Sequence, residues 1–276
     1  MRGQDILART MSIATSRGDK AGLWQYHSRS DAHSKVACWT LLFDALIECD
    51  ILRSHAEQGK LGFGINFEMV GPISKTLDLV LTRVPPNRLD RSRRTFATLA
   101  DQFRIVLDAE DQRLLNLMPT IAHDDDQDNS EVVLALEAKA CMTEHIKAMP
   151  RLHAEILATG YLAKRAMPRC IVVSYTLINT ASTFRTPSGA GKTNHHSQPS
   201  DTNRVIEMLA QAIPLARDMN NLIGYDVVGT TAMHCANDGS PVVVDESLIW
   251  PDRAGAVKYE RMIRSLCSEY RARAGH

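Results

Sequence analysis

The sequence predicts an α/β protein with a mixed central β-sheet flanked by helices, and three observations support this fold class. Two apolar stretches, residues 131–136 and 169–178, are typical of strands that are buried on both faces. A helical pattern from residue 143 to about residue 165 separates them, which predicts a parallel pair joined by a helix. A hairpin signal earlier in the chain adds antiparallel strands, so the predicted sheet is mixed.

Size and composition indicate a single folded unit. The 276 residues fit one large domain or two small ones, and without an internal repeat or a clear linker we predict one domain over residues 1–276. Weak periodicity over residues 1–29 predicts a peripheral arm, and residues 84–130 are the expected insertion. Lys plus Arg and Asp plus Glu number 32 each, so net charge neither favours nor excludes a nucleic-acid partner.

Cysteine usage and hydropathy indicate the compartment. The six cysteines lie in apolar segments without the CxxC spacing of zinc sites, which favours reduced thiols and a cytoplasmic location. Charged residues interrupt the apolar ones near the N-terminus, so no signal-peptide core is expected there, and no later run approaches membrane-spanning length. We therefore expect a soluble protein with no membrane partner.

The first half of the chain predicts helix, hairpin and helix. Apolar residues at helical spacing follow the cap residue Ser30 and predict a first helix to about residue 55. Two strands, over residues 63–70 and 76–81, flank a turn at residues 71–75 and predict a hairpin. A basic stretch and a helical pattern to about residue 117 follow, and an acidic loop then leads into the strand at residue 131.

The second half predicts a C-terminal extension of the same sheet. A polar loop over residues 180–203 is followed by a helix from about residue 201 to residue 218. Two apolar stretches, 224–233 and 241–249, flank an Asn-Asp-Gly-Ser turn, which predicts a hairpin because Asp-Gly supplies the positive φ angles of tight turns. A final amphipathic helix completes the chain.

Glu137 and Lys139 form the most informative pair of charges. They close the apolar strand that begins at residue 131, and on a strand both side chains point to the same side. Opposite charges at the end of a buried strand lose hydration, so they require partners or a function. The functional interpretation is a metal site with a lysine beside it, and the alternative is a buried ion pair or a solvated strand end.

The order helix, hairpin carrying Asp78, strand ending in Glu137-Ala-Lys139, helix and strand resembles the PD-(D/E)XK nuclease superfamily over residues 33–178. The resemblance implies a restriction-endonuclease-like core, to which the C-terminal hairpin and helix are additions. It also implies that Asp78 and Glu137 bind one or two Mg²⁺ ions and that Lys139 orients or activates a water for attack on a phosphodiester. Leu77 stands where the family motif has proline, which is a departure from the pattern.

The chemistry of magnesium accounts for these residue types. Mg²⁺ takes oxygen ligands and keeps several waters, so two carboxylates and a substrate phosphate suffice to hold it. The ion lowers the pKa of bound water and neutralises charge on phosphate oxygens, and a nearby lysine can donate a hydrogen bond to the nucleophile. The register inferred from the hairpin turn places Glu68 opposite Asp78, so Glu68 is a candidate third carboxylate.

Basic residues near the motif are candidate contacts to nucleic-acid phosphates. The start of a helix attracts anions, and counterion release gives basic clusters affinity for DNA. A solvated helix start and a solvated loop are the alternatives. The candidates are His145, Lys147 and Arg151 at the helix start and Arg88, Arg91, Arg93 and Arg94 in the basic stretch.

Together these patterns predict a Mg²⁺-dependent endodeoxyribonuclease, and the resemblance implies a type II restriction endonuclease or a related phage-defence nuclease. Duplex cleavage requires two active sites, so we expect a homodimer acting on DNA. An RNA or repair nuclease with the same site is one alternative. A catalytically silent protein of the same fold that binds nucleic acid or a protein partner is the other.

Overall fold

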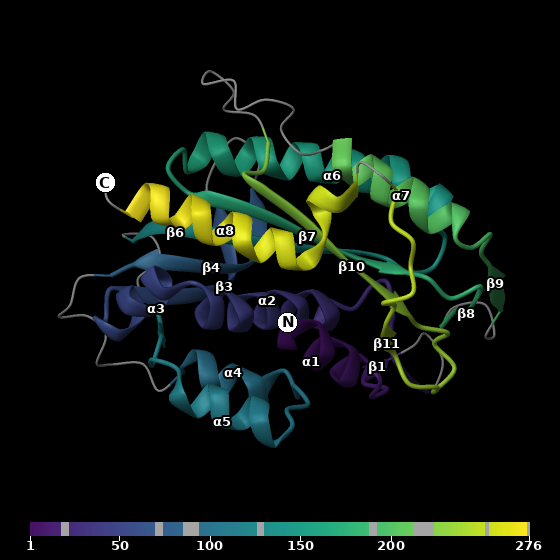
Figure 1. The fold of residues 1–276 in the computed structure, drawn as a ribbon, viewed down its shortest axis with the longest axis horizontal. Helices are drawn as coiled ribbons and strands as arrows, with labels where there is room; N and C mark the ends of the chain where they lie inside the picture. Colours follow the sequence, from purple (N-terminus) through teal and green to yellow (C-terminus); the bar gives the residue numbers. More distant parts are fainter. Residues whose placement is uncertain are drawn as a thin grey trace.

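The computed structural model describes residues 1–17, 22–69, 74–84, 94–125, 130–187, 192–211, 224–251 and 254–274. These residues contain a seven-stranded mixed sheet of order β11-β10-β7-β6-β4-β3-β5. This confirms the predicted α/β class with helices on both faces of a central sheet (Figure 1). The strands of this sheet are β3 (Leu61–Met69), β4 (Lys75–Arg83), β5 (Ala122–His123), β6 (Glu131–Cys141), β7 (Ile171–Asn179), β10 (Val227–His234) and β11 (Val243–Val244).

The centre of the sheet is parallel. β6 pairs in parallel with β7, and β7 pairs in parallel with β10, so the predicted strand–helix–strand unit is confirmed. All nine residues of β7 are buried, as its continuous apolar sequence predicted for a strand covered on both faces. β10 also pairs antiparallel with β11, which confirms the C-terminal hairpin, although β11 contains only two residues.

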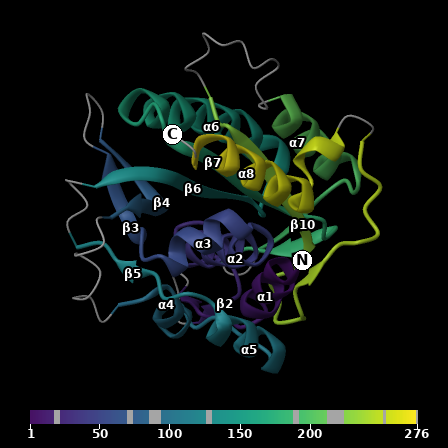
Figure 2. The ribbon, with the colours of Figure 1, turned by 60° about the vertical axis from the view of Figure 1, so that its left-hand side comes forward.

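Two layers of helices enclose the sheet. α1 (Arg2–Met11), α2 (Ala32–Glu48) and α8 (Tyr259–Ala274) contribute to the core on one face. α6 (His145–Ala166) and α7 (Ser200–Gln211) cover the other face (Figure 2). None of the described helices has the length and apolar character that crossing a membrane requires.

Three predicted helices have different boundaries. The helix expected over residues 30–55 is divided into α2 and α3 (Asp50–Glu57), because Cys49 is extended, with φ −110° and ψ 93°. The pattern that ends near residue 117 is likewise divided, into α4 (Phe96–Gln102) and α5 (Ala109–Leu117). α6 begins at His145, two residues after the predicted start, and it is continuous through Pro150.

Residues 1–29 are not peripheral. Ile6 and Leu7 of α1 are fully buried in the core that α2 also lines, so the N-terminal helix is part of the fold. A short antiparallel pair, β1 (Ser16–Arg17) and β2 (Leu23–Trp24), follows it. The loop expected over residues 180–203 holds another such pair, β8 (Thr183–Arg185) and β9 (Thr193–His195), and a 3₁₀ helix (Ala254–Val257) precedes α8.

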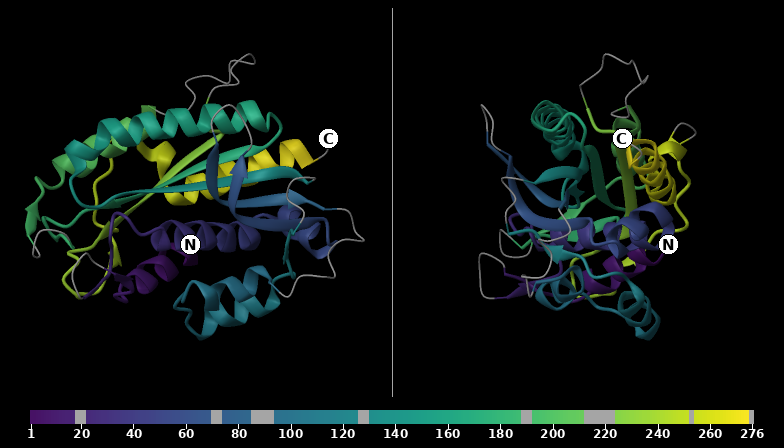
Figure 3. Two further views of the ribbon diagram at one scale, coloured as in Figure 1. Left: turned by 180° about the vertical axis from the view of Figure 1, so that it is seen from behind. Right: turned by 90° about the vertical axis from the view of Figure 1, so that its left-hand side faces the viewer.

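The hairpin of β3 and β4 leaves the sheet at its far end. The ladder between β4 and β6 ends at the pair Leu79–Leu136, whereas the ladder between β3 and β4 continues to Met69–Lys75. Met69 packs in the core cluster that contains residues of α6, so this end of the hairpin lies on the α6 side of the sheet (Figure 3). The strands that carry Asp78 and Glu137 therefore separate where these two residues lie.

Candidate functional site

Asp78 and the Glu137-Ala138-Lys139 segment meet where β4 and β6 separate. The Asp78 Oδ2 atom accepts a hydrogen bond of 2.9 Å from the backbone N–H of Ala138, between the two charged residues. Its Oδ1 atom accepts a hydrogen bond of 2.9 Å from the hydroxyl of Ser34, near the start of α2. The structure thus brings together the three residues that the sequence motif singled out.

Glu137 is the most deeply buried member of this group, with 2% of its surface exposed. Its Oε1 atom lies 2.6 Å from the Nζ of Lys139 and 3.1 Å from the Nζ of Lys75. Its Oε2 atom is buried and has no hydrogen-bond partner among the described residues, and the same is true of the hydroxyl of Ser174, which pairs with Glu137 across the sheet. One oxygen of this carboxylate is thus neutralised by two ammonium groups, while the other is buried and has no hydrogen-bond partner among the described residues.

Burial and charge alter the acidity of the site. Burial and the negative charge of Glu137 raise the pKa of Asp78 to about 6, although its hydrogen bonds from Ala138 and Ser34 act in the opposite direction. Burial lowers the pKa of Lys139, but the carboxylates of Glu137 and Asp78 outweigh this effect, so the net shift is upward. Lys139 is therefore a cation held beside two carboxylates that repel each other.

A cleft of about 350 Å³ opens beside these residues. Asp78 and Lys139 line it together with the segment that precedes α2 and with the first turns of α6. Arg29 and Arg151 contribute to its walls, and the Arg151 side chain is 79% exposed. The pKa of His33, also in the wall, is lowered to about 4 by burial, so this ring is neutral near pH 7. The cleft is thus lined by groups of both charges, because Asp31 and Glu155 lie in its walls as well.

The residues present fit a hard divalent cation. Glu137 supplies a buried carboxylate oxygen that lacks a partner among the described residues. Asp78 supplies a second carboxylate, whose pKa is raised by burial and by the negative charge of Glu137, and a cation would offset both effects. Within the described ranges no group of three or more His, Cys, Asp or Glu side chains is placed to bind a metal. Mg²⁺ would therefore have two carboxylate ligands here, and water and substrate would supply the others.

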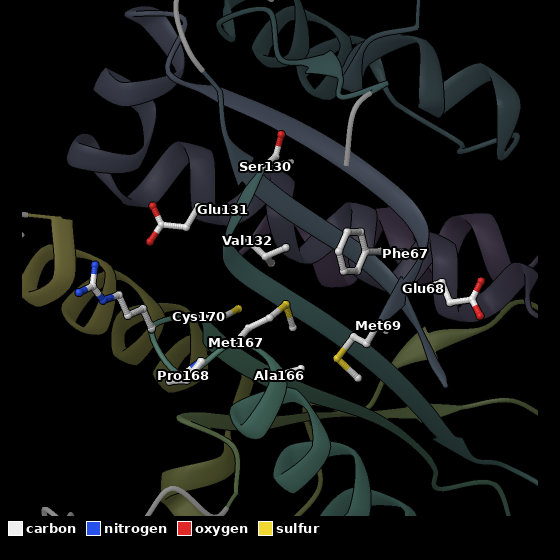
Figure 4. A pocket seen from close by; sticks show the side chains of 11 residues that line it. Phe67, Glu68, Met69, Ser130, Glu131, Val132, Ala166, Met167, Pro168 and Cys170 are labelled. Atoms are coloured by element: carbon white, nitrogen blue, oxygen red, sulfur yellow. The ribbon is translucent and has the colours of Figure 1, made fainter. Parts of the chain in front are cut away.

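Glu68 is not placed as the sequence predicted. It pairs with Thr76, and the residues between the pairs Ile65–Leu79 and Phe67–Leu77 are Asn66 and Asp78. The predicted strands imply that residues 70 and 76 form the last pair before the turn, whereas in the structure the last pair is Met69–Lys75, so the register differs from the predicted one. Glu68 instead lines a separate cavity of about 470 Å³ between the hairpin, the start of β6 and the end of α6 (Figure 4). The assignment of Glu68 as a third carboxylate opposite Asp78 was therefore wrong.

The basic residues predicted to contact phosphate differ in their exposure and partners. His145 is 1% exposed, and its Nε2 atom lies 2.7 Å from the carbonyl oxygen of Asn179, so the prediction that it contacts nucleic acid was wrong. The Lys147 side chain is 77% exposed and pairs with Glu144. Arg94 donates hydrogen bonds to Gln102, and Arg88, Arg91 and Arg93 lie outside the described residues.

Two further residues were not identified from the sequence. Lys75 was assigned to the end of a turn, and only the bend of the hairpin brings its ammonium to Glu137. Glu155 lies on α6, where its Oε2 atom is 4.0 Å from the Nζ of Lys139 and its Oε1 atom is 3.5 Å from the Nε of Arg151. Its position four residues after Arg151 was the available signal, since residues at this spacing are neighbours on a helix.

Comparisons of this chain with protein-family models, with curated proteins and with solved structures give no match.

Proposed function

We propose that this protein is a Mg²⁺-dependent endodeoxyribonuclease with a restriction-endonuclease-like core. The observation that carries the proposal is the hydrogen bond from Ala138 N–H to Asp78, which joins an aspartate on one strand to the middle of a Glu-x-Lys segment on the next. The order α2, β3, β4, β6, α6, β7 supports it, because the family resemblance implies this order of helix, hairpin, strand, helix and strand.

Each residue has a role that its surroundings support. Asp78 and Glu137 would hold Mg²⁺ through their carboxylates, which lie just beyond the point where the β4–β6 ladder ends. Bound there, the ion would supply charge neutralisation at the phosphate and a lower pKa for its water. Lys139 keeps its proton and donates a hydrogen bond to the attacking water, whose orientation determines the direction of attack. Arg151, exposed at the wall of the cleft, binds a phosphate of the substrate backbone.

The test is cleavage of supercoiled plasmid by the purified protein with MgCl₂. We expect Glu137→Ala and Lys139→Ala to lower the cleavage rate by about 100-fold or more, because the first removes a ligand of the metal and the second removes the donor that orients the attacking water. Glu131→Ala, at the exposed start of the same strand, and Lys60→Ala, on the surface, are the matched controls and should cleave at the wild-type rate. Circular dichroism of each variant confirms that it is folded.

The outcomes separate the alternatives. Cleavage that persists in both site variants would contradict the assignment of the site. Cleavage of structured RNA but not of plasmid would identify an RNA nuclease that uses the same residues. If the wild-type protein cleaves neither substrate but retards DNA in a gel, it is a catalytically silent nucleic-acid-binding protein of this fold.

A further inference from the structure

Lys75 gives the candidate site a second lysine. Its Nζ atom lies 3.1 Å from the Glu137 Oε1 atom, which also receives the Lys139 ammonium at 2.6 Å. The Lys75 side chain is 29% exposed, while the Glu137 side chain is 3% exposed. A buried carboxylate is thus neutralised by two cations on a single oxygen, and together with Asp78 the group contains two negative and two positive charges.

The two lysines are held differently. Lys139 is on β6 in the middle of the sheet, and its ammonium has Glu155 at 4.0 Å in addition to Glu137. Lys75 is at the end of the hairpin that leaves the sheet, and Glu137 is the acidic partner of its ammonium among the described residues. The long, flexible stem of lysine lets its ammonium move several ångströms without a change in the backbone. Lys75 is therefore the cation that can leave this site more easily.

The charge balance changes if a divalent cation binds. A dication between Asp78 and Glu137 would stand next to two ammonium groups, and in a site with little water such like charges repel strongly. One ammonium then has to withdraw. Glu155 continues to hold Lys139, whereas Lys75 loses its partner.

We propose that Lys75 is a positioning residue that acts through Glu137: it is the counter-charge of Glu137 in the metal-free protein, and binding of a divalent cation displaces it. This inference rests on the metal site of the proposed function. It assigns the two lysines distinct roles, since Lys139 remains at the reacting centre and Lys75 competes with the metal for Glu137.

The first experiment measures Mn²⁺ binding by calorimetry with the full chain and no nucleic acid. Lys75→Met keeps the length of the side chain but removes its charge, and we expect it to bind Mn²⁺ about tenfold more tightly because the competing cation is gone. Lys75→Arg keeps the charge and should bind Mn²⁺ with wild-type affinity. Lys60→Met, at an exposed lysine outside the site, is the matched control and should also be unchanged.

The sign of the change makes the test specific. If Lys75 served only to hold Glu137 in place, Lys75→Met would bind Mn²⁺ more weakly than the wild type, and that result would overturn the proposal. Equal affinities for Lys75→Met and the wild type would also overturn it, yet they would leave the metal site intact. If the wild type binds no Mn²⁺, the metal site of the proposed function is wrong, and the displacement of Lys75 is wrong with it.

A second measurement uses the wild-type chain, so it holds even if Lys75→Met does not fold. Lysine acetylation by acetic anhydride, followed by mass spectrometry, reports how accessible each ammonium is. We expect the labelling rate of Lys75 to rise several-fold on addition of Mg²⁺ while that of Lys60 stays constant. A labelling rate of Lys75 that is unchanged or lower with Mg²⁺ would contradict the displacement.

Discussion

Asp44 is a buried carboxylate on α2 and does not line the cleft. It is 2% exposed and accepts a hydrogen bond of 2.9 Å from the backbone N–H of Gly3 in α1. Burial raises its pKa to about 6, although the hydrogen bonds from Gly3 and Tyr259 act in the opposite direction. The folded protein therefore binds a proton at Asp44 more tightly than the unfolded chain does.

This difference predicts how stability depends on pH. Because the pKa of Asp44 is raised on folding, its favourable contribution is complete below about pH 4 and is lost as pH rises to about 6, a change of at most about 3 kcal/mol. Asp44→Asn lacks this titration, so its free energy of unfolding relative to that of the wild type should be higher at pH 7 than at pH 4. Urea unfolding of both proteins at the two pH values measures this difference.

A matched control is available on the next helix. Asp50 is an exposed aspartate at the start of α3, and Asp50→Asn should follow the wild-type pH profile. If the stabilities of Asp44→Asn and the wild type change in parallel from pH 4 to pH 7, the buried carboxylate does not titrate as the structure indicates.

At the level of single residues, the sequence predicted the relative placement of two side chains best where both lie on the same strand. Glu137 and Lys139 are two residues apart on β6, so their common side followed from strand geometry alone. Lys75 could not be found in this way, because its contact with Glu137 depends on where the hairpin bends. Glu68 was misplaced for a related reason: a change in the last pair before a turn displaces every pair of the hairpin.

Among the helices, the packing of α1 on α2 depends on a very close approach at Gly3. A Cβ atom at this position would lie 2.5 Å from the carbonyl oxygen of Thr40 and 2.6 Å from the hydroxyl of Tyr259. We therefore expect Gly3→Ala to lower the free energy of unfolding by about 1–3 kcal/mol, since the backbone of α2 cannot move away easily. Chemical denaturation measures the difference.

The control for this substitution is another glycine without close neighbours. A Cβ atom at Gly255, in the 3₁₀ helix before α8, would meet nothing within 4 Å. Gly255→Ala should therefore leave stability nearly unchanged. If Gly3→Ala were as stable as Gly255→Ala, α1 would be loosely attached, as the sequence had suggested for residues 1–29.

Sequence periodicity predicted best those elements whose burial pattern is the same along their whole length. β7 lies in the middle of the sheet, and α8 has one apolar face, so both were located correctly. The break between α2 and α3 was missed because Cys49 is apolar and fully buried, as a residue within a continuous helix could be, and no Gly or Pro marks the change of direction. Tertiary packing determines this boundary, and a pattern along the chain does not contain it.

At the scale of the whole molecule, the described chain provides a single Asp78–Glu137–Lys139 site, whereas duplex DNA has two antiparallel strands. The proposed nuclease therefore needs either two copies related by a two-fold axis or two successive encounters with the DNA. The equal numbers of basic and acidic residues give no overall attraction to DNA, so correct docking of two copies would depend on local contacts such as Arg151.

Mixed dimers distinguish these arrangements. Two differently tagged chains, one wild type and one Glu137→Ala, can be co-expressed and purified through both tags. If two copies act together, the mixed dimer should nick supercoiled plasmid and release it as an open circle, because only one strand meets a complete site. A tandem-purified dimer of two wild-type chains is the control and should produce linear DNA. Linear DNA formed by the mixed dimer at the control rate would show that a single site cuts both strands in turn.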